Sequence, residues 1–218
     1  MNTVHRANER YGDPPREFPR DSEVLIVVDP QSDFCPGGAL AVPHGDEIMP
    51  LVNRLARRFA HVILTQDWHE PGHASFASAH AGRRPYDTIA LAYGPQILWP
   101  DHCVQGTAGA EFHRDLDIPR AELIVRKGFH PGIDSYSAFR ENDRQTPTGL
   151  AGYLRERGFG RVTLCGLATD FCVLYSALDS RAAGFETAVA LDACRGIDLD
   201  GSLGKALAAM RAAGVWFI

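Results

Sequence analysis

The chain has 218 residues, of which 45% are hydrophobic and 22% are charged, and its formal net charge is −5. This length suits one domain with a sizeable core, and the mildly acidic balance gives no reason to expect nucleic acid or a membrane as a partner. We find no apolar run long enough to span a bilayer and no secretory signal. The chain's five cysteines are too sparse for a disulfide framework, so we expect a reducing, cytoplasmic setting.

The first 22 residues differ in composition from the rest. They are rich in charged residues and proline, and Asp13-Pro14-Pro15 blocks regular structure, so we expect residues 1–22 to form a polar extension. Residues 23–218 show no linker and no internal repeat, and we expect them to form a single domain.

Predicted strands alternate with predicted helices through residues 23–218. Short apolar runs predict strands at residues 23–29, 61–66, 123–127, 162–165, 187–192 and 215–218. Apolar residues at helical spacing predict helices at residues 46–60, 148–157, 171–183 and 202–213, the last of them capped by Ser202. The long stretch 70–122 has few regular signals, which is typical of a functional loop or of a segment with short elements that the sequence does not locate. The alternation predicts an α/β fold with three layers, α/β/α, around a six-stranded and mostly parallel sheet.

The stretch 165–173 joins a predicted strand to a predicted helix through a tight turn. Cys172 lies where that helix begins, among N–H groups without helical partners and near the positive end of the helix dipole. Both features favour a thiolate, and the same N–H groups are suited to hold an oxyanion. The alternative is that Cys172 is a small apolar core residue, which is the commoner fate of a free cysteine.

Two further strand ends place Asp29 and Lys127 at the sheet edge where Cys172 is expected. Lys127 would lower the pKa of the thiol, and Asp29 would accept its proton and later return one to a leaving amine. Taken singly, Asp29 could cap a turn and Lys127 could be solvated, so the hypothesis depends on all three residues together.

A second set of residues has the spacing of metal ligands. Asp67 and His69 are one residue apart, so in an extended backbone their side chains point to the same face. With His102 and His73 they offer a carboxylate and two or three imidazoles, which suit Zn²⁺, Fe²⁺ or Mn²⁺. His73 could equally be a loop histidine that hydrogen-bonds the backbone.

Five short motifs follow one another along the chain: Asp29-Pro30-Gln31-Ser32-Asp33-Phe34-Cys35, Asp67-Trp68-His69, Trp99-Pro100-Asp101-His102-Cys103-Val104, Lys127-Gly128 and Gly166-Leu167-Ala168-Thr169-Asp170-Phe171-Cys172-Val173. In order and spacing over residues 23–218 they resemble the nicotinamidases (pyrazinamidases) of the isochorismatase-like hydrolase superfamily. The resemblance implies that superfamily's fold, a catalytic triad and a metal beside it. The triad would be Asp29, Lys127 and Cys172, and the metal ligands Asp67, His69, His102 and, as in some members, His73.

The same resemblance implies a pocket and a reaction. Phe34, Trp99 and Tyr136 would wall the pocket around a pyridine ring. The Leu167–Ala168 peptide would be cis, so that the N–H of Ala168 contributes to substrate binding and, with that of Cys172, holds the oxyanion.

We therefore expect an amidohydrolase of NAD salvage that converts nicotinamide to nicotinate and ammonia through a thioester on Cys172. Pyrazinamide would be converted to pyrazinoate in the same way. The expected cofactor is one divalent metal ion, Zn²⁺ ahead of Fe²⁺ or Mn²⁺. The expected partner is the small-molecule substrate, with a homo-oligomer as a further possibility.

Four other readings compete with this one. A carbamoyl or ureido amidohydrolase would keep the triad but would have no use for Asp67, His69 and His102. An isochorismate hydrolase would not need Cys172. A metal-hydroxide hydrolase would carry the cysteine incidentally, and a non-catalytic binding module would share the fold alone.

Overall fold

The computed structural model describes residues 22–218, so all but the last residue of the predicted extension 1–22 lies outside the described residues. One six-stranded sheet, in the order β5-β2-β1-β6-β7-β8, forms the centre of this part of the chain. All of its pairings are parallel. Its strands are β1 (Glu23–Val28), β2 (His61–Asp67), β5 (Leu123–Lys127), β6 (Arg161–Leu167), β7 (Glu186–Arg195) and β8 (Trp216–Phe217).

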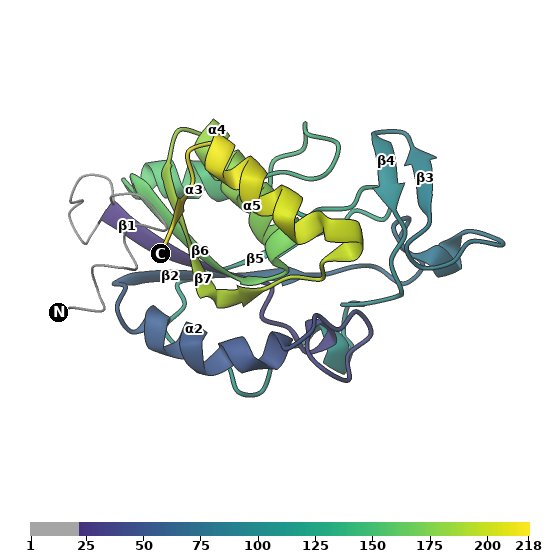
Figure 1. Cartoon of the computed structure of the whole chain (residues 1–218), viewed down its shortest axis with the longest axis horizontal. Helices are drawn as coiled ribbons and strands as arrows, with labels where there is room; N and C mark the ends of the chain where they lie inside the picture. The colour runs from purple at the N-terminus through teal and green to yellow at the C-terminus, as the bar shows by residue number, and fades with distance from the viewer. Residues whose placement is uncertain (1–21) are drawn as a thin grey trace.

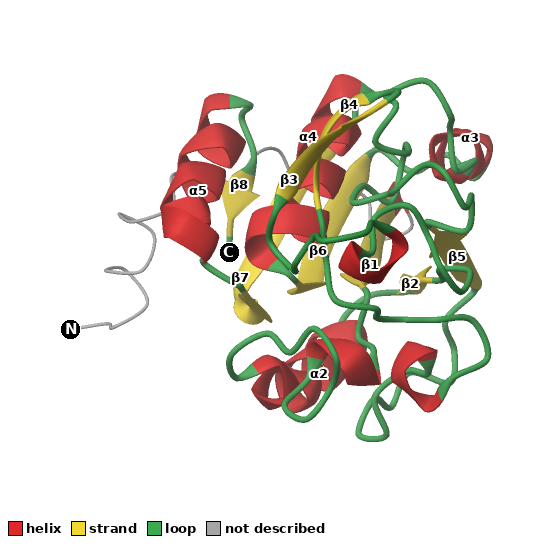
Figure 2. Ribbon diagram, turned by 90° about the vertical axis from the view of Figure 1, so that its right-hand side faces the viewer, coloured by secondary structure: helices red, strands yellow, loops and turns green. Residues whose placement is uncertain are grey.

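Helices cover both faces of the sheet, which confirms the predicted three-layer α/β fold (Figure 1). Helix α2 (Met49–Ala56) lies on one face, and α3 (Leu150–Glu156), α4 (Leu174–Ala182) and α5 (Ser202–Ala212) lie on the other (Figure 2). Crossovers between parallel strands are right-handed, so a chain that reverses its direction across the sheet places its helices on opposite faces. None of the described helices has both the length and the apolar character needed to cross a bilayer.

The chain reverses that direction between β1 and β6. From β1 it moves outward to β2, and from β6 it moves the other way to β7 and β8. Both central strands are apolar on both faces, and Val24 to Val28 are fully buried. In open α/β sheets ligands bind beyond the carboxyl ends of the strands at this switch point. The site is therefore expected just after Val28 and Gly166, which are partners in the sheet register.

The bounds of one predicted helix and the cap of another are wrong. The predicted helix 46–60 is a 3₁₀ turn (Gly45–Ile48) followed by the short helix α2, whose first turn contains Pro50. Ser202 does not cap α5, because Gly201 occupies the capping position and the Ser202 hydroxyl instead donates to the carboxylate of Asp170.

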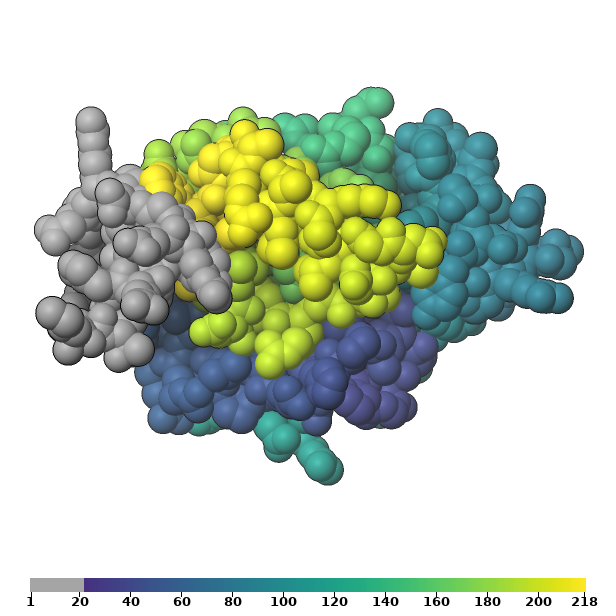
Figure 3. Space-filling view, viewed as in Figure 1, coloured from purple at the N-terminus to yellow at the C-terminus, as the bar shows by residue number. Residues whose placement is uncertain are grey.

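The long stretch 70–122 contains a two-stranded antiparallel hairpin that the sequence did not predict. Its strands are β3 (Thr88–Leu91) and β4 (Gly94–Ile97). Four-residue strands that contain a glycine and a proline give no clear alternation, so their pairing is not visible in the sequence. Figure 3 shows this segment, in teal, forming one end of the molecule beyond the sheet.

Candidate active site

Lys127, the last residue of β5, connects the residues predicted to form the triad. Its Nζ is fully buried and lies 2.8 Å from Asp29 Oδ2 and 3.5 Å from Cys172 Sγ. It also donates hydrogen bonds to Asp67 Oδ1 at 2.7 Å and to the Ser135 carbonyl at 2.9 Å. One ammonium group thus joins the predicted nucleophile, the predicted base and the first metal-ligand candidate.

The sheet register explains this meeting. Asp67 and Lys127 are direct partners at the ends of β2 and β5. Asp29 follows β1, the other neighbour of β2, in a left-handed conformation with φ of 46°. The hydroxyl of Thr65 accepts the Asp29 N–H at 3.0 Å and donates to Asp29 Oδ1 at 2.5 Å. Thr65 therefore orients the carboxylate, a role that sequence reasoning missed although a polar residue in a buried apolar strand is a usable signal.

The charges around Cys172 favour the neutral thiol. Burial raises the pKa of Cys172 well above its ordinary value; Lys127 opposes this increase, and the carboxylates of Asp29 and Asp67 add to it. Lys127 lowers the pKa of Cys172 as expected, but burial and the two carboxylates outweigh it, so these protein groups favour the thiol over the expected thiolate. A thiol that loses its proton only during attack needs a base within reach.

Asp29 has the properties of that base. Its burial raises its pKa above the ordinary value, and Asp67 adds to this while Lys127 opposes it. The ligand atoms of Asp29, Asp67 and Cys172 all lie within 4.8 Å of one another. Lys127 itself remains an ammonium: burial would lower its pKa, but Asp29 and Asp67 outweigh burial and raise that pKa well above its usual range.

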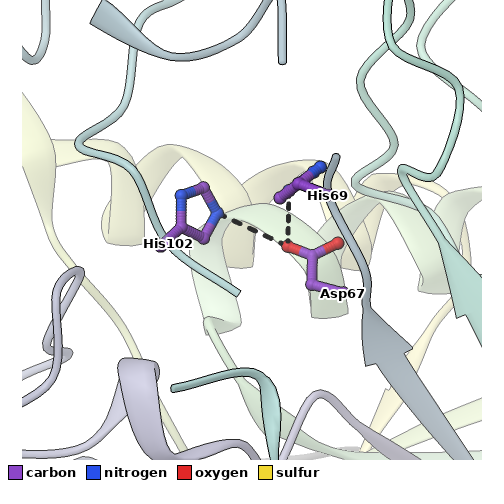
Figure 4. A group of neighbouring side chains, drawn as sticks. All are labelled: Asp67, His69 and His102. Carbon is purple, nitrogen blue, oxygen red and sulfur yellow. Dashed lines mark ion pairs between the residues drawn. The ribbon is translucent and has the colours of Figure 1, made fainter. Parts of the chain in front are cut away.

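Asp67, His69 and His102 form a compact buried group in which both imidazole rings face one carboxylate oxygen (Figure 4). Their Nε2 atoms lie 3.4 Å and 3.6 Å from Asp67 Oδ2. The Nδ1 atoms lie 2.8 Å from the carbonyls of Gly128 and Pro100. A carbonyl can only accept, so Nδ1 of each ring donates to it, and Nε2 is the nitrogen turned toward Asp67.

These residues fit a divalent cation. His69 Nε2 is buried and has no hydrogen-bond partner, and it faces an oxygen that cannot donate to it. Burial would lower the pKa of His69, but Asp67 outweighs burial and raises it, so a positive charge between the two groups is favoured. One carboxylate and two imidazoles are a ligand set for Zn²⁺, Fe²⁺ or Mn²⁺.

His73 is not brought into this group. Its ring lies 4.5 Å from that of His69, centroid to centroid, but its Nδ1 is 2.8 Å from Ser75 Oγ and its Nε2 is 2.8 Å from the His130 carbonyl. Both ring nitrogens are thus engaged by the protein, and its role as a ligand stays a prediction.

Gly128 makes the position of His69 possible. Its φ is +67°, and a Cβ added there would lie 2.5 Å from His69 Cε1 and 2.8 Å from His69 Nδ1. Only glycine allows the backbone to come this close and to offer its carbonyl to the ring. The Lys127-Gly128 pair therefore places an ammonium and a histidine support at one strand end.

A pocket opens onto Cys172 and onto two of the metal-ligand candidates, Asp67 and His102. The predicted pocket residues Phe34, Trp99, Tyr136 and Ala168 all line it. Sequence reasoning missed the other members of its wall, which are Leu40, Asp134, Phe171 and Ile197. Flat aromatic walls are typical of a pocket for a planar ring.

Cys172 lies in a single π-helical turn (Thr169–Val173) between β6 and α4. The preceding Leu167–Ala168 peptide is cis, as predicted. The predicted oxyanion donor Ala168 thus lies in the pocket wall together with Cys172.

Comparison with known proteins identifies the family. The sequence model of the Isochorismatase domain matches residues 23–218. The chain belongs to the isochorismatase family. It is 58% identical to the curated nicotinamidase of Acinetobacter baylyi over 191 residues, which cover 88% of this chain and 89% of that protein.

Solved structures agree with this family assignment. A nicotinamidase/pyrazinamidase structure from Acinetobacter baumanii is 56% identical, has a TM-score of 0.90, and matches over 91% of this chain and 96% of that one. The pyrazinamidase of Pyrococcus horikoshii, solved in complex with zinc, is 39% identical with a TM-score of 0.75, and the match covers 90% of this chain and 98% of that one.

This member of the isochorismatase family also holds its site through polar residues whose roles the sequence did not reveal. The Gln31 amide accepts the Asp67 N–H at 2.7 Å and donates to the Asp67 carbonyl at 2.8 Å, which fixes the end of β2. Asp170 accepts the N–H groups of Ile197 and Asp198 at 2.9 Å and 2.8 Å, and so fastens the turn of Cys172 to the loop before α5.

Proposed function

We propose that this protein is a nicotinamidase, which hydrolyses nicotinamide to nicotinate and ammonia in NAD salvage and pyrazinamide to pyrazinoate. The observation that carries the proposal is the position of Lys127 Nζ, 2.8 Å from Asp29, 2.7 Å from Asp67 and 3.5 Å from Cys172, the last two of which line an aromatic pocket. The named activities of the relatives described above support it.

In the first half-reaction, Cys172 Sγ attacks the carboxamide carbon while Asp29 accepts the thiol proton. Negative charge develops on the carbonyl oxygen, and the N–H groups of Ala168 and Cys172 stabilise it. Asp29 then gives its proton to the amide nitrogen, the C–N bond breaks, and ammonia leaves a thioester on Cys172. Lys127 holds Asp29 and the sulfur of Cys172 in position relative to each other, and it offsets the negative charge of the Asp29 carboxylate.

In the second half-reaction, Asp29 takes a proton from water as the water oxygen attacks the thioester carbon. The C–S bond breaks, the proton on Asp29 returns to the sulfur, and the product leaves as nicotinic acid, which loses its proton to solvent to give nicotinate. Each donor to the oxyanion is expected to stabilise the transition state by about 3 kcal/mol.

Asp67, His69 and His102 would hold one divalent ion, with His73 as a further candidate. Bound there, the ion would act as a Lewis acid toward a ring nitrogen or a water molecule. We propose zinc ahead of iron or manganese, and the zinc complex of the Pyrococcus horikoshii relative supports this choice.

We further infer a reducing compartment such as the cytoplasm, because all five cysteines are free. Residues 23–218 are proposed to form one domain, and a homo-oligomer is a proposal that sedimentation velocity would test.

Ammonia release from nicotinamide tests the proposed activity, with and without prior chelation and with and without thiol alkylation. We expect release from the metal-replete protein and its loss after either treatment. Release that survives alkylation would contradict the role of Cys172. No release from untreated protein would overturn the proposal and would make ureido or carbamoyl amides the next substrates to assay.

A further inference from the structure

The substrate pocket contains one carboxylate that makes no ion pair with any residue the structure describes. Asp134, in the loop that follows β5, lines the pocket and is only 2% exposed. Asp29 and Asp67, the other carboxylates of the site, each make an ion pair with Lys127. Within residues 22–218 we find no ion pair that involves Asp134.

Neutral donors hold this carboxylate in place. Asp134 Oδ1 accepts the N–H of Ser135 at 2.7 Å, and Oδ2 accepts from Gln96 Nε2 at 2.8 Å. The side-chain amide oxygen of Gln96, Oε1, in turn accepts from the hydroxyl of Tyr93 at 2.9 Å and from Asn142 Nδ2 at 3.3 Å. These bonds fix the amide so that its nitrogen faces Asp134.

This network is part of the pocket wall. Gln96 is 1% exposed, and its Nε2 also lies 3.1 Å from the Tyr136 hydroxyl. The Trp99 indole N–H donates to that hydroxyl at 3.1 Å. The charge of Asp134 is therefore fixed beside the aromatic side chains proposed to hold the substrate ring.

The net charge of the site can be compared with the charges of the substrate and the product. Asp29, Asp67 and Asp134 contribute three negative charges and Lys127 one positive charge. A divalent ion on Asp67, His69 and His102 would bring the total to zero with Cys172 as a thiol. Without Asp134 the total would be +1, and such a pocket would attract the anionic product more than the uncharged substrate.

We propose that Asp134 is a specificity-determining residue that selects uncharged aryl carboxamides over the corresponding carboxylates and so weakens binding of the product. The inference rests on the proposed function and goes beyond it, because it assigns discrimination between amide and acid to a residue that takes no part in the bond-making steps. The interaction of two unit charges a few ångströms apart at a protein site corresponds to a change of about tenfold or more in a dissociation constant.

Equilibrium binding to metal-loaded protein tests this directly. In a Cys172→Ala background nicotinamide is bound without turnover, so the dissociation constants of nicotinamide and nicotinate can be measured side by side. Adding Asp134→Asn is expected to lower the ratio of the nicotinate constant to the nicotinamide constant about tenfold. Asp134→Glu, which keeps the charge, is the matched control and should leave that ratio within about twofold of its starting value.

An unchanged ratio in a folded Asp134→Asn protein would overturn the inference. If both dissociation constants change by the same factor, the ratio is unchanged and Asp134 only shapes the pocket. If the asparagine variant does not fold, Asp134→Ser removes the same charge and the same ratio decides. Ammonia release by the protein with Cys172 intact is measured in parallel, so that a failure of the proposed function is recognised independently of the ratio.

Discussion

Two buried polar groups lie close to Cys172, and they differ in how completely their atoms are satisfied. The carboxylate of Asp170 accepts two backbone N–H groups and the hydroxyl of Ser202. Around Lys127, by contrast, His69 Nε2 has no hydrogen-bond partner, and Asp29 Oδ2 has only its ion pair with the ammonium. Buried polar atoms are normally satisfied, so an unsatisfied one calls for an explanation.

This difference indicates that the Asp170 group has a structural role and that the Lys127 group has a chemical one. The Asp170 carboxylate accepts from three protein donors and holds two loops together. The Lys127 group leaves two acceptors without a hydrogen-bond partner, His69 Nε2 and Asp29 Oδ2. A bound cation and a bound substrate would supply the missing partners. Substitutions in the first group should therefore reduce stability, and substitutions in the second should remove activity or metal.

The largest expected effect is that of Cys172→Ala on turnover. The variant loses the only sulfur in contact with Lys127 among the described residues, and ammonia release from nicotinamide should fall by at least about 10³-fold. Its melting temperature should stay close to that of the parent protein. Cys165→Ala, which removes a fully buried thiol outside the pocket, is the control and should retain turnover. Substantial release by Cys172→Ala would contradict the nucleophile assignment.

Lys127→Met should strongly reduce both activity and stability. It leaves the buried carboxylates of Asp29 and Asp67 without their shared cation, which costs about 3–5 kcal/mol of unfolding free energy. Urea unfolding monitored by circular dichroism measures this. Adding Asp29→Asn should restore part of the loss, since one of the two unpaired charges is then absent. An unfolding free energy equal to that of the parent would show that the ammonium does not offset these charges.

Replacing two of the proposed ligands should remove the metal. Asp67→Ala together with His69→Ala leaves one imidazole of the group, and bound metal measured by elemental analysis should fall from about one ion per chain to less than about a tenth. His113→Ala, a histidine beside Asp115 outside this group, is the matched control and should keep its metal. Unchanged metal content in the double variant would refute the ligand assignment.

Asp170→Ala should reduce stability without removing metal. It leaves two backbone N–H groups and the Ser202 hydroxyl without their acceptor, which costs about 1–3 kcal/mol. Chemical denaturation measures the loss. The exposed Asp192→Ala should change the unfolding free energy by less than about 0.5 kcal/mol. Equal stability of the two variants would mean that the Asp170 carboxylate does not hold the loops together.

The smallest effect concerns pH. Burial raises the pKa of Glu141 from 4.5 to about 7; His130 opposes the increase, and Asp143 and Asp134 add to it. The folded protein therefore favours protonated Glu141, a contribution to stability that is complete below pH 4.5 and is lost as the pH rises through 7. Glu141→Gln should become more stable relative to the parent between pH 5 and pH 8, as seen in melting temperatures. The exposed Glu156→Gln should show no such trend, and a flat difference for Glu141→Gln would contradict the raised pKa.

The sequence by itself determined the layered sheet and which residues reach its functional edge. Periodicity, spacing and strand ends are local properties, so the positions of Asp29, Lys127 and Cys172 and the candidate metal ligands were readable, and the motif resemblance added the pocket residues. The helix starting at residue 46 and the cap at Ser202 were predicted wrongly, because the local signal there was outweighed by a 3₁₀ turn and by the hydrogen bond to Asp170.

Only the tertiary structure decided how these groups act on one another. The protonation of Cys172 depends on two carboxylates and one ammonium that come from three different strand ends. The lone pairs of His69 and His102 are directed by carbonyls at Gly128 and Pro100. The Asp134 carboxylate is held in place by a hydrogen bond from Gln96, which lies in a hairpin that the sequence did not predict. Such effects arise from contacts between residues distant in the chain and from burial, and neither is encoded in local spacing.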